Sequence, residues 1–260
     1  MDREEDRSIE PREDSRRAKK IISVFDADGI PFVTAHNKFG AIPKTLQECL
    51  DLTDQYIFNI NKAVKAKFYV GFLTKGKCFR YRINPTYKAN RRYDNLPRYL
   101  NEVREHLVVK HNFTFDEEYE ADDLVLSFKK QYSDKYNCCI ISSDKDILGS
   151  TDISYNPRRA EYSYNNEYEI LDNFWRSMIS GDTIDGIKGI PGKGPAYYRD
   201  ITEEYAGIGL HTIVLDSYID HFGEYEGIKE FHKNYLSLKI LDNVHIGEIK
   251  LNKVEKVLSE

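Results

Sequence analysis

Seven acidic residues stand in three short clusters, and each cluster lies beside an apolar run of the chain. They are Glu120, Asp122, Asp123, Asp144, Asp146, Asp182 and Asp185. Because like charges repel, a fold that brings these clusters together is destabilised unless cations lie between the carboxylates. The clusters contain no His or Cys, and sites built only from Asp and Glu oxygens suit Mg²⁺ or Mn²⁺. The pattern is typical of a two-metal phosphodiesterase.

Two of these clusters have spacings that bring carboxylates together. In EYEADD, Glu120 and Asp123 share one face of a helix, and three acids in four positions exceed what the helix dipole requires. In SSDKD, Asp144 and Asp146 are two residues apart, so on an extended segment both side chains point the same way. The plainer reading of the same residues is helix capping, with Asp144 at the start of a helix. Each cluster alone leaves both readings open.

Strand-like apolar runs alternate with stretches of helical periodicity. We predict strands within KKIISVFDADG and at residues 67–73 and 138–142, and helices at 44–65 and 98–110 and within EYEADDLVLSFKKQY and DNFWRSMISG. This alternation indicates an α/β fold with a mainly parallel central sheet flanked by helices, followed by a helical subdomain. Ligands of open α/β sheets bind outside the carboxyl ends of the strands, where Asp26 and the pair Asp144 and Asp146 follow predicted strands.

A strongly basic stretch covers residues 75–92 of a chain whose formal net charge is -5. It has no acid and contains Lys75, Lys77, Arg80, Arg82, Lys88, Arg91 and Arg92, interleaved with Phe79, Tyr81 and Tyr87. Any charge run is by default a solvated face of the protein. Basic side chains for phosphates beside aromatic rings for bases are also how single-stranded nucleic acid is held. In a net-acidic chain, this concentration of positive charge favours a nucleic-acid contact.

The segment GDTIDGIKGIPGKG has five glycines and is followed by helical signals. Tight turns of this kind present backbone N–H groups and a helix N-terminus to a phosphate, with Lys188 and Lys193 nearby. The segment lacks the GxxxxGK[ST] pattern, so nucleotide hydrolysis is unsupported. An ordinary loop is the alternative.

Other sequence features indicate the cellular compartment in which the protein is expected. No run is long and apolar enough to span a bilayer, and the N-terminus lacks the apolar core of a signal peptide. Four cysteines without CxxC spacing indicate free thiols in a reducing cytoplasm. Seven scattered histidines form no HxH or HExxH pattern, so the motifs predict no zinc site.

Taken in order, these segments resemble the flap endonuclease and 5′→3′ exonuclease family, especially its bacteriophage members. The resemblance runs from about residue 21 to the 190s, and it is carried by the strand ending in Asp26, TYKANR, EADD, SSDKD and GDTIDGIKGIPGKG. It implies a PIN-like 5′-nuclease fold with a helix–three-turn–helix subdomain. We therefore expect a catalytic domain at 19–174 and a helical DNA-binding subdomain at 175–260, after a flexible charged tail at 1–18.

The resemblance also implies roles for single residues. It assigns one metal ion to Asp26, Glu120, Asp122 and Asp123, and a second to Asp144, Asp146, Asp182 and Asp185. Lys88 and Arg91 resemble the family's basic pair that contacts the scissile phosphate, and Tyr87 is expected to stack on a base. The turn with Gly189, Gly192, Lys193 and Gly194 is expected to grip the duplex backbone, with K⁺ as a further ligand there.

The chain departs from the family at two points. Relatives usually carry an Asp at the end of the second strand, where this chain has Thr74 or Lys75. One carboxylate is therefore missing, and Lys75 is a candidate for a fixed cation in the space of the first metal. The first aspartate is also ambiguous, and we prefer Asp26 to Asp28 because it directly follows the apolar run.

The expected function is Mg²⁺-dependent hydrolysis of DNA at or near 5′ ends, in DNA replication or degradation, with two ions and Mn²⁺ as a substitute. The expected partner is DNA with a 5′ flap or a free 5′ end, in the host cytoplasm if a phage encodes the chain. One alternative is an enzyme of the same architecture that removes RNA primers from an RNA–DNA hybrid. The other is a DNA-junction-binding protein with little turnover, which the missing carboxylate suggests.

Overall fold

The computed structural model describes residues 19–36, 42–91 and 94–254, so the predicted tail at 1–18 and Arg92 lie outside the described residues. The main sheet contains β1 (Lys20–Asp26), β2 (Phe68–Thr74), β3 (Thr114–Asp116), β4 (Tyr136–Ile141), β5 (Ile153–Asn156), β6 (Glu161–Tyr164) and β9 (Asn252–Lys253). Its order is β3-β2-β1-β4-β5-β6, with β9 also paired to β2. The strands from β3 to β5 are parallel, whereas β6 and β9 are antiparallel to their neighbours. The predicted mainly parallel sheet is confirmed.

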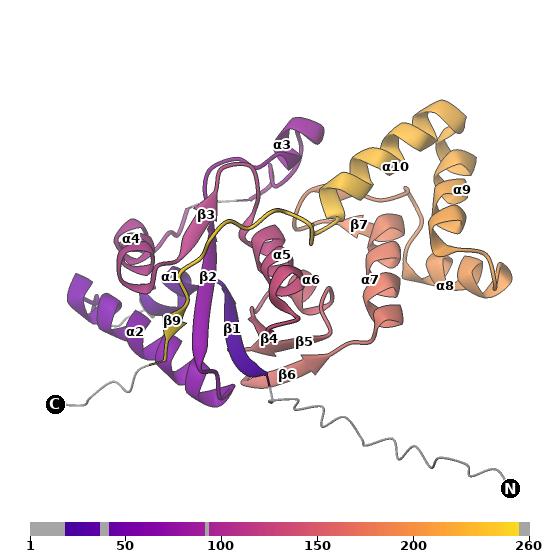
Figure 1. Ribbon diagram of the computed structural model, residues 1–260. Helices are drawn as coiled ribbons and strands as arrows, with labels where there is room; N and C mark the ends of the chain where they lie inside the picture. The colour runs from indigo at the N-terminus through magenta and orange to yellow at the C-terminus, as the bar shows by residue number, and fades with distance from the viewer. Residues whose placement is uncertain (1–18, 37–41, 92–93, 255–260) are drawn as a thin grey trace, which may run out of the picture.

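Both faces of the sheet are covered (Figure 1). On one face lie α1 (Ile30–Thr34), α2 (Leu46–Ala63) and α4 (Leu100–His111). On the other lie α5 (Ala121–Tyr132) and the chain segment 240–251. Consecutive residues of β1 serve the two layers, because Val24 packs on the α5 side and Phe25 on the α2 side. A strand buried on both faces is an apolar run without polar alternation, which is how this sheet is recognisable in the sequence.

Local signals set the ends of the longer helices. The N-cap Thr45 and Glu48 form a capping box at the start of α2, and α4 ends where Asn112 adopts the left-handed conformation at φ 49°. A capping box also begins α5, where Glu120 is the N-cap and Asp123 the third residue. The capping reading of the EYEADD acids is thus partly correct, since both acids accept backbone N–H groups there.

A second, helical layer of the molecule lies beside the sheet (Figure 1). It contains α7 (Glu167–Ser180), α8 (Pro195–Glu204), α9 (Leu210–Phe222) and α10 (Glu224–Leu238). Their shared core is built around Trp175, Tyr218 and Phe231. Two short helices, α3 (Arg80–Ile83) and α6 (Lys145–Leu148), and a small hairpin of β7 (Gly181–Asp182) and β8 (Ile187–Lys188) complete the fold. The predicted C-terminal helical region is therefore present.

The C-terminal segment does not stay with the helices. After α10 the chain crosses back to the sheet, where Ile246 is buried against α5 and β9 pairs with β2 (Figure 1). The predicted boundary between residues 174 and 175 lies within α7. The division of the chain at that point remains a prediction, and the returning segment links the two regions physically.

The sequence did not predict one hairpin of the sheet, and it predicted the state of the cysteines only in part. The β5–β6 hairpin extends the sheet at its far edge, and no strand was predicted there. All four cysteines are buried and free, and burial raises the pKa of Cys138 to about 11.

In the part of the chain that the structure describes, no helix is long and apolar enough to cross a membrane.

Candidate metal centre and nucleic-acid cleft

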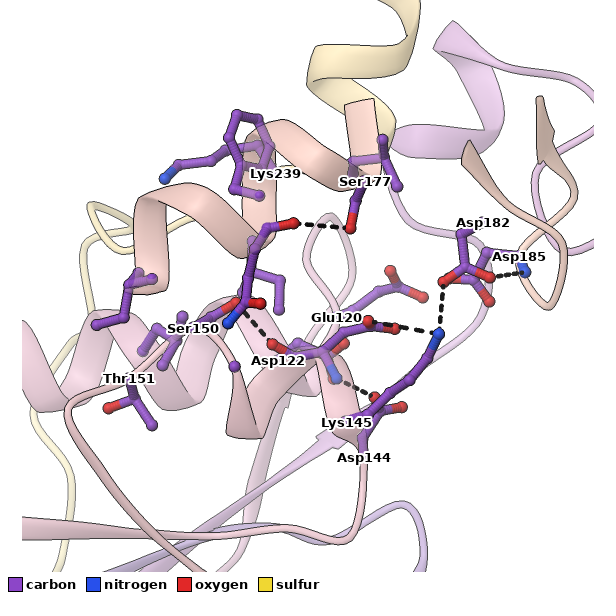
Figure 2. A pocket seen from close by; sticks show the side chains of 18 of the residues that line it. Glu120, Asp122, Asp144, Lys145, Ser150, Thr151, Ser177, Asp182, Asp185 and Lys239 are labelled. Carbon is purple, nitrogen blue, oxygen red and sulfur yellow. Dashed lines mark hydrogen bonds and ion pairs between the residues drawn. The ribbon is translucent and has the colours of Figure 1, made fainter. Parts of the chain in front are cut away.

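A cleft of about 1080 Å³ opens where α5, α6, α7 and the β7–β8 hairpin meet. Six of the eight carboxylates predicted as metal ligands line it, namely Glu120, Asp122, Asp144, Asp146, Asp182 and Asp185. Figure 2 shows five of them around this space, on segments that are far apart in the sequence. The fold therefore gathers most of the predicted set around one cleft, to which the carboxyl end of β4 contributes Asp144 and Asp146.

Parallel pairing explains how two of the segments meet. Phe25 of β1 lies in register with Ile141 of β4, so Asp26 and Ser142 emerge side by side. The Ser142 hydroxyl donates to Asp26 Oδ2 at 2.8 Å and accepts the backbone N–H of Asp144 at 3.0 Å. Asp144 then caps α6 by accepting the N–H of Asp146 at 2.8 Å. A continuous series of hydrogen bonds therefore links Asp26, at the end of β1, to Asp144 and Asp146, which follow β4.

Burial and repulsion from neighbouring carboxylates raise the pKa of three of these acids. Burial, followed by repulsion from Asp28, raises the pKa of Asp26 to about 7. Burial and the charge of Asp26 raise the pKa of Asp122 well above its ordinary value. Loss of water contact and the charge of Asp144 raise the pKa of Asp146 to about 7. A bound divalent cation would remove this repulsion, which is why the group fits a metal site.

The donor set also fits a hard ion. Across residues 19–36, 42–91 and 94–254, no Lys or Arg nitrogen lies within 4.0 Å of a carboxylate oxygen of Asp26, Asp122 or Asp144. Oxygen-only sites of this kind suit Mg²⁺ or Mn²⁺ better than softer ions. These three residues are accordingly the strongest candidates for direct ligands.

The other cleft acids already have basic partners. Glu120 accepts hydrogen bonds from Lys88, from the Tyr87 hydroxyl at 2.6 Å and from Arg80 at 3.2 Å. Burial alone would raise the pKa of Glu120, but Lys88 and Arg80 outweigh burial and hold the pKa below its ordinary value. Asp185 accepts from Arg91 at 2.6 Å. These contacts place the predicted basic pair directly beside the predicted metal ligands.

Asp182 belongs to β7, and Figure 2 shows it beside Asp185. Its Oδ1 accepts the backbone N–H of Ile184 at 2.7 Å, which shapes the turn between β7 and β8. Lys145 Nζ lies 3.7 Å from Asp182 Oδ2 and 3.9 Å from Asp146 Oδ1. The exposed Lys145 therefore bridges the two acids that were predicted to serve a second ion.

Asp123 does not belong to this group, which corrects its assignment as a metal ligand. Its side chain is fully buried at the first turn of α5 and receives two hydrogen bonds from Arg80, at 2.6 and 2.7 Å. It also accepts the backbone N–H groups of Glu120 and Leu241. Successive residues of a helix point about 100° apart, so Asp122 faces the cleft and Asp123 faces the interior.

Tyr87 also differs from its predicted role. Only 3% of the residue is exposed, and it packs against Cys78 and Ile187 while its hydroxyl donates to Glu120. A ring enclosed in this way has no free face for a base. The structure thus gives Tyr87 the role of orienting Glu120 in place of stacking.

Lys75 is directed away from the cleft, which corrects its interpretation as a fixed cation in the metal space. Its ammonium lies 3.0 Å from Glu117 and over the ring of Phe115. Thr74 accepts the N–H of Ala121 through its hydroxyl, and its own N–H lies 3.0 Å from Asp28 Oδ1. Asp28 therefore brings a carboxylate to the end of β2, where the chain lacks the expected one.

The Gly-rich turn depends on close backbone contact. A Cβ on Gly189 would lie 2.1 Å from the carbonyl oxygen of Ile179 and 2.5 Å from the nitrogen of Gly181. Beyond it, Gly192 has φ +74°, Gly194 is the N-cap of α8, and Lys193 Nζ lies 3.9 Å from the ring centre of Tyr197. The chain thus passes from α7 through a tight turn into α8, and the contact of this turn with a DNA duplex stays a prediction.

Gly189→Ala is expected to lower the free energy of unfolding by about 1–3 kcal/mol, because backbone atoms on both sides would have to move apart. Urea unfolding followed by circular dichroism measures this. The control is Gly247→Ala in the segment between α10 and β9, where an added Cβ meets nothing within 4 Å and a change within about 0.5 kcal/mol is expected. Equal stability of the two variants would contradict the close contact.

Comparison with known proteins shows which protein family has a sequence similar to this chain. Residues 39–170 match the family model described as 5'-3' exonuclease, N-terminal resolvase-like domain. The chain is 34% identical over 139 residues to DNA polymerase I of Borreliella burgdorferi, a match that covers 45% of this chain but only 15% of that protein.

Two solved structures show the same fold. The T5 D15 protein co-crystallised with metal ions superposes with a TM-score of 0.64 at 20% identity, over 86% of this chain and 90% of that one. The T5 5'-exonuclease with divalent zinc ions gives 0.60 at 22% identity, over 84% of this chain and 86% of that one. At this identity the likeness establishes the architecture of the sheet and the helical region.

Proposed function

The chain belongs to the 5'-3' exonuclease family, and on that premise we propose that it is a Mg²⁺-dependent nuclease that hydrolyses DNA phosphodiester bonds at or near 5′ ends. The observation that carries the proposal is the mutual repulsion of Asp26, Asp122 and Asp144 at the edge of a cleft that is also lined by the basic pair Lys88 and Arg91. The chain spans only 15% of the DNA polymerase I that it matches, so the activity is proposed for this region alone.

The proposed metal ligands divide between two ions. Asp26 and Asp122, with Glu120 nearby, would hold the first, whereas Asp144, Asp146, Asp182 and Asp185 would hold the second directly or through water. When bound, such ions supply an activated water and stabilise the negative charge on the leaving oxygen. The DNA-complexed T5 flap endonuclease, whose structure contains metal ions, supports this use of the cleft.

Lys88 and Arg91 bind and orient the scissile phosphate in this proposal. Only 10% of the Lys88 side chain is exposed, and although burial lowers its pKa, the charges of Glu120 and Asp185 outweigh burial and keep the ammonium protonated. Both basic groups are held by acids of the same cleft. They can therefore turn to a phosphate as charge grows there, at little cost in reorganisation.

The turn at Gly189–Gly194 would position the duplex through its backbone N–H groups and through Lys193, with K⁺ as an additional ligand. Contacts of this type go to phosphates and carry no base information, so selection should follow DNA structure. A role in DNA replication or degradation is consistent with such selection.

One observation favours a second candidate, a DNA-junction-binding protein with little turnover. The end of β2 has Thr74 where relatives usually carry a carboxylate. Asp28 supplies a carboxylate close to the end of β2, but its Oδ1 also accepts a hydrogen bond from Arg104 at 2.9 Å. Removal of RNA from an RNA–DNA hybrid by the same cleft is a third possibility, distinguished by comparing matched RNA–DNA and DNA–DNA flaps.

The deciding experiment uses a 5′-end-labelled flap duplex incubated with Mg²⁺, Mn²⁺ or EDTA. Cleavage with either metal and none in EDTA is expected. The variant Asp144→Asn/Asp146→Asn is the control and should bind the flap without cutting it. Tight binding without cleavage in either metal would overturn hydrolysis and favour the junction-binding protein.

A further inference from the structure

Away from the cleft, three potential metal ligands converge between two helices. Asp54 of α2 accepts hydrogen bonds at the same oxygen, Oδ1, from Nε2 of His106 at 2.7 Å and from Nε2 of His111 at 2.8 Å, both in α4. Among the described residues, this is the one group of three such ligand atoms within 4.8 Å of one another. None of the three residues lines the cleft.

We propose that Asp54, His106 and His111 form a separate site for a transition-metal ion, with Zn²⁺ as the best fit. Two imidazole nitrogens and one carboxylate oxygen are a common protein ligand set for zinc, with water in the fourth position. Imidazole also selects against Mg²⁺, which prefers oxygen ligands. The site is therefore distinct in chemistry from the oxygen-only cleft.

The geometry requires only a small opening of the cluster. Ligand atoms that surround a tetrahedral zinc ion at about 2.0–2.2 Å stand roughly 3.3–3.5 Å from one another. The present nitrogen–oxygen distances, 2.7 and 2.8 Å, are about 0.5–0.8 Å shorter than this. The side chains of His106 and Asp54 are 15% and 22% exposed, so water has access as a fourth ligand.

The surroundings suit a metal-bound imidazole. His111 Nδ1 lies 2.9 Å from the Tyr69 hydroxyl, which can either donate or accept a proton. With Nε2 on a metal, Nδ1 carries the proton and donates it to Tyr69, the outer contact that usually orients a ligating histidine. The carbonyl of His111 also accepts from Asn252, which fixes the end of α4.

Lys110 opposes the binding of a cation here. Its ammonium contacts Asp54 Oδ2, the oxygen that the histidines do not use. The Lys110 side chain is 57% exposed, so it can swing into solvent when an ion binds. Its removal should therefore strengthen zinc binding, whereas removal of either histidine should weaken it.

The test is made on the full chain carrying Asp122→Asn and Asp144→Asn, which removes a candidate ligand of each of the two proposed cleft ions. After treatment with EDTA, the protein is titrated with Zn²⁺ by calorimetry and with Co²⁺ by visible absorption, since tetrahedral Co²⁺ with nitrogen ligands gives intense bands. One site is expected. His106→Gln or His111→Gln should weaken it at least about 100-fold, and Tyr69→Phe about 10-fold.

Two further variants keep the result decisive. Lys110→Ala should tighten zinc binding about tenfold, because it removes a competing positive charge. His245→Gln changes an exposed histidine elsewhere and should leave binding unchanged. Thermal melts in EDTA show whether each variant is folded. Zinc affinity and Co²⁺ bands that are the same in folded His106→Gln as in its parent would overturn the site.

Discussion

Asp122→Asn is expected to reduce phosphodiester hydrolysis by at least about 10³-fold, while binding of a flap duplex stays equal or becomes tighter. The rate effect follows from the several kcal/mol of transition-state stabilisation that a metal site supplies, where each 1.36 kcal/mol is a factor of ten. Binding should not suffer, because the change removes a negative charge from a surface that receives phosphates.

Among the acids of the cleft, Asp122 gives the clearest test of metal binding by substitution. In the described part of the chain no Lys or Arg nitrogen lies within 4.0 Å of its carboxylate. Burial, Asp26 and Glu120 raise its pKa against the opposing charge of Lys88. Asn has almost the same shape, so packing in the first turn of α5 is retained. Without metal, the variant should melt at a higher temperature than the parent protein, because one repelling charge is gone.

Metal-induced stabilisation separates this explanation from a loss of packing. Mg²⁺ should raise the melting temperature of the parent protein and have little effect on Asp122→Asn. Asp134→Asn, an exposed acid just beyond the same helix, is the matched control and should behave as the parent does. Full activity of Asp122→Asn, or an undiminished Mg²⁺ shift, would argue against Asp122 as a ligand.

The sheet and most helices were predictable, because doubly buried strands and helical periodicity are properties of local sequence. The run ending in Asp26 and the CCIIS segment form β1 and β4, and their acids meet because parallel neighbours end at one edge. The β5–β6 hairpin was missed, since its strands of four residues are too short for a clear pattern. The pairing of β9 depends on a contact with β2 that no local signal announces.

Most residues of the site were predictable from the sequence, but the partner and the role of each residue were not. Asp122 and Asp123 are adjacent acids with equal claims in the sequence, and the partner Arg80, which decides between them, lies some forty residues earlier. The basic run was read as one surface, yet Arg80 is buried and Arg82 pairs with Glu118. Asp54, His106 and His111 were missed because their convergence comes from two helices, with no short-range motif.

Arg80→Met is expected to lower the free energy of unfolding by about 3–5 kcal/mol, which is typical when one partner of a buried ion pair is removed. Arg80 is 2% exposed and donates to Asp123 with both terminal nitrogens. It also donates to the carbonyl oxygens of Ser237 and Lys239, at 3.2 and 2.6 Å. Its loss leaves a buried carboxylate and frees the segment that carries the chain from α10 back to the sheet.

Urea unfolding measures the loss, and hydrogen exchange of residues 238–246 should show it first at that segment. Asp123→Asn tests the same network from the other side and should also destabilise the fold while the Mg²⁺ shift is retained, unlike Asp122→Asn. The double variant Arg80→Met/Asp123→Leu should recover part of the stability, because no unpaired charge remains buried. If Asp123→Asn instead abolished the Mg²⁺ shift at unchanged stability, Asp123 would be a metal ligand, and the buried ion pair would not describe the working state of the cleft.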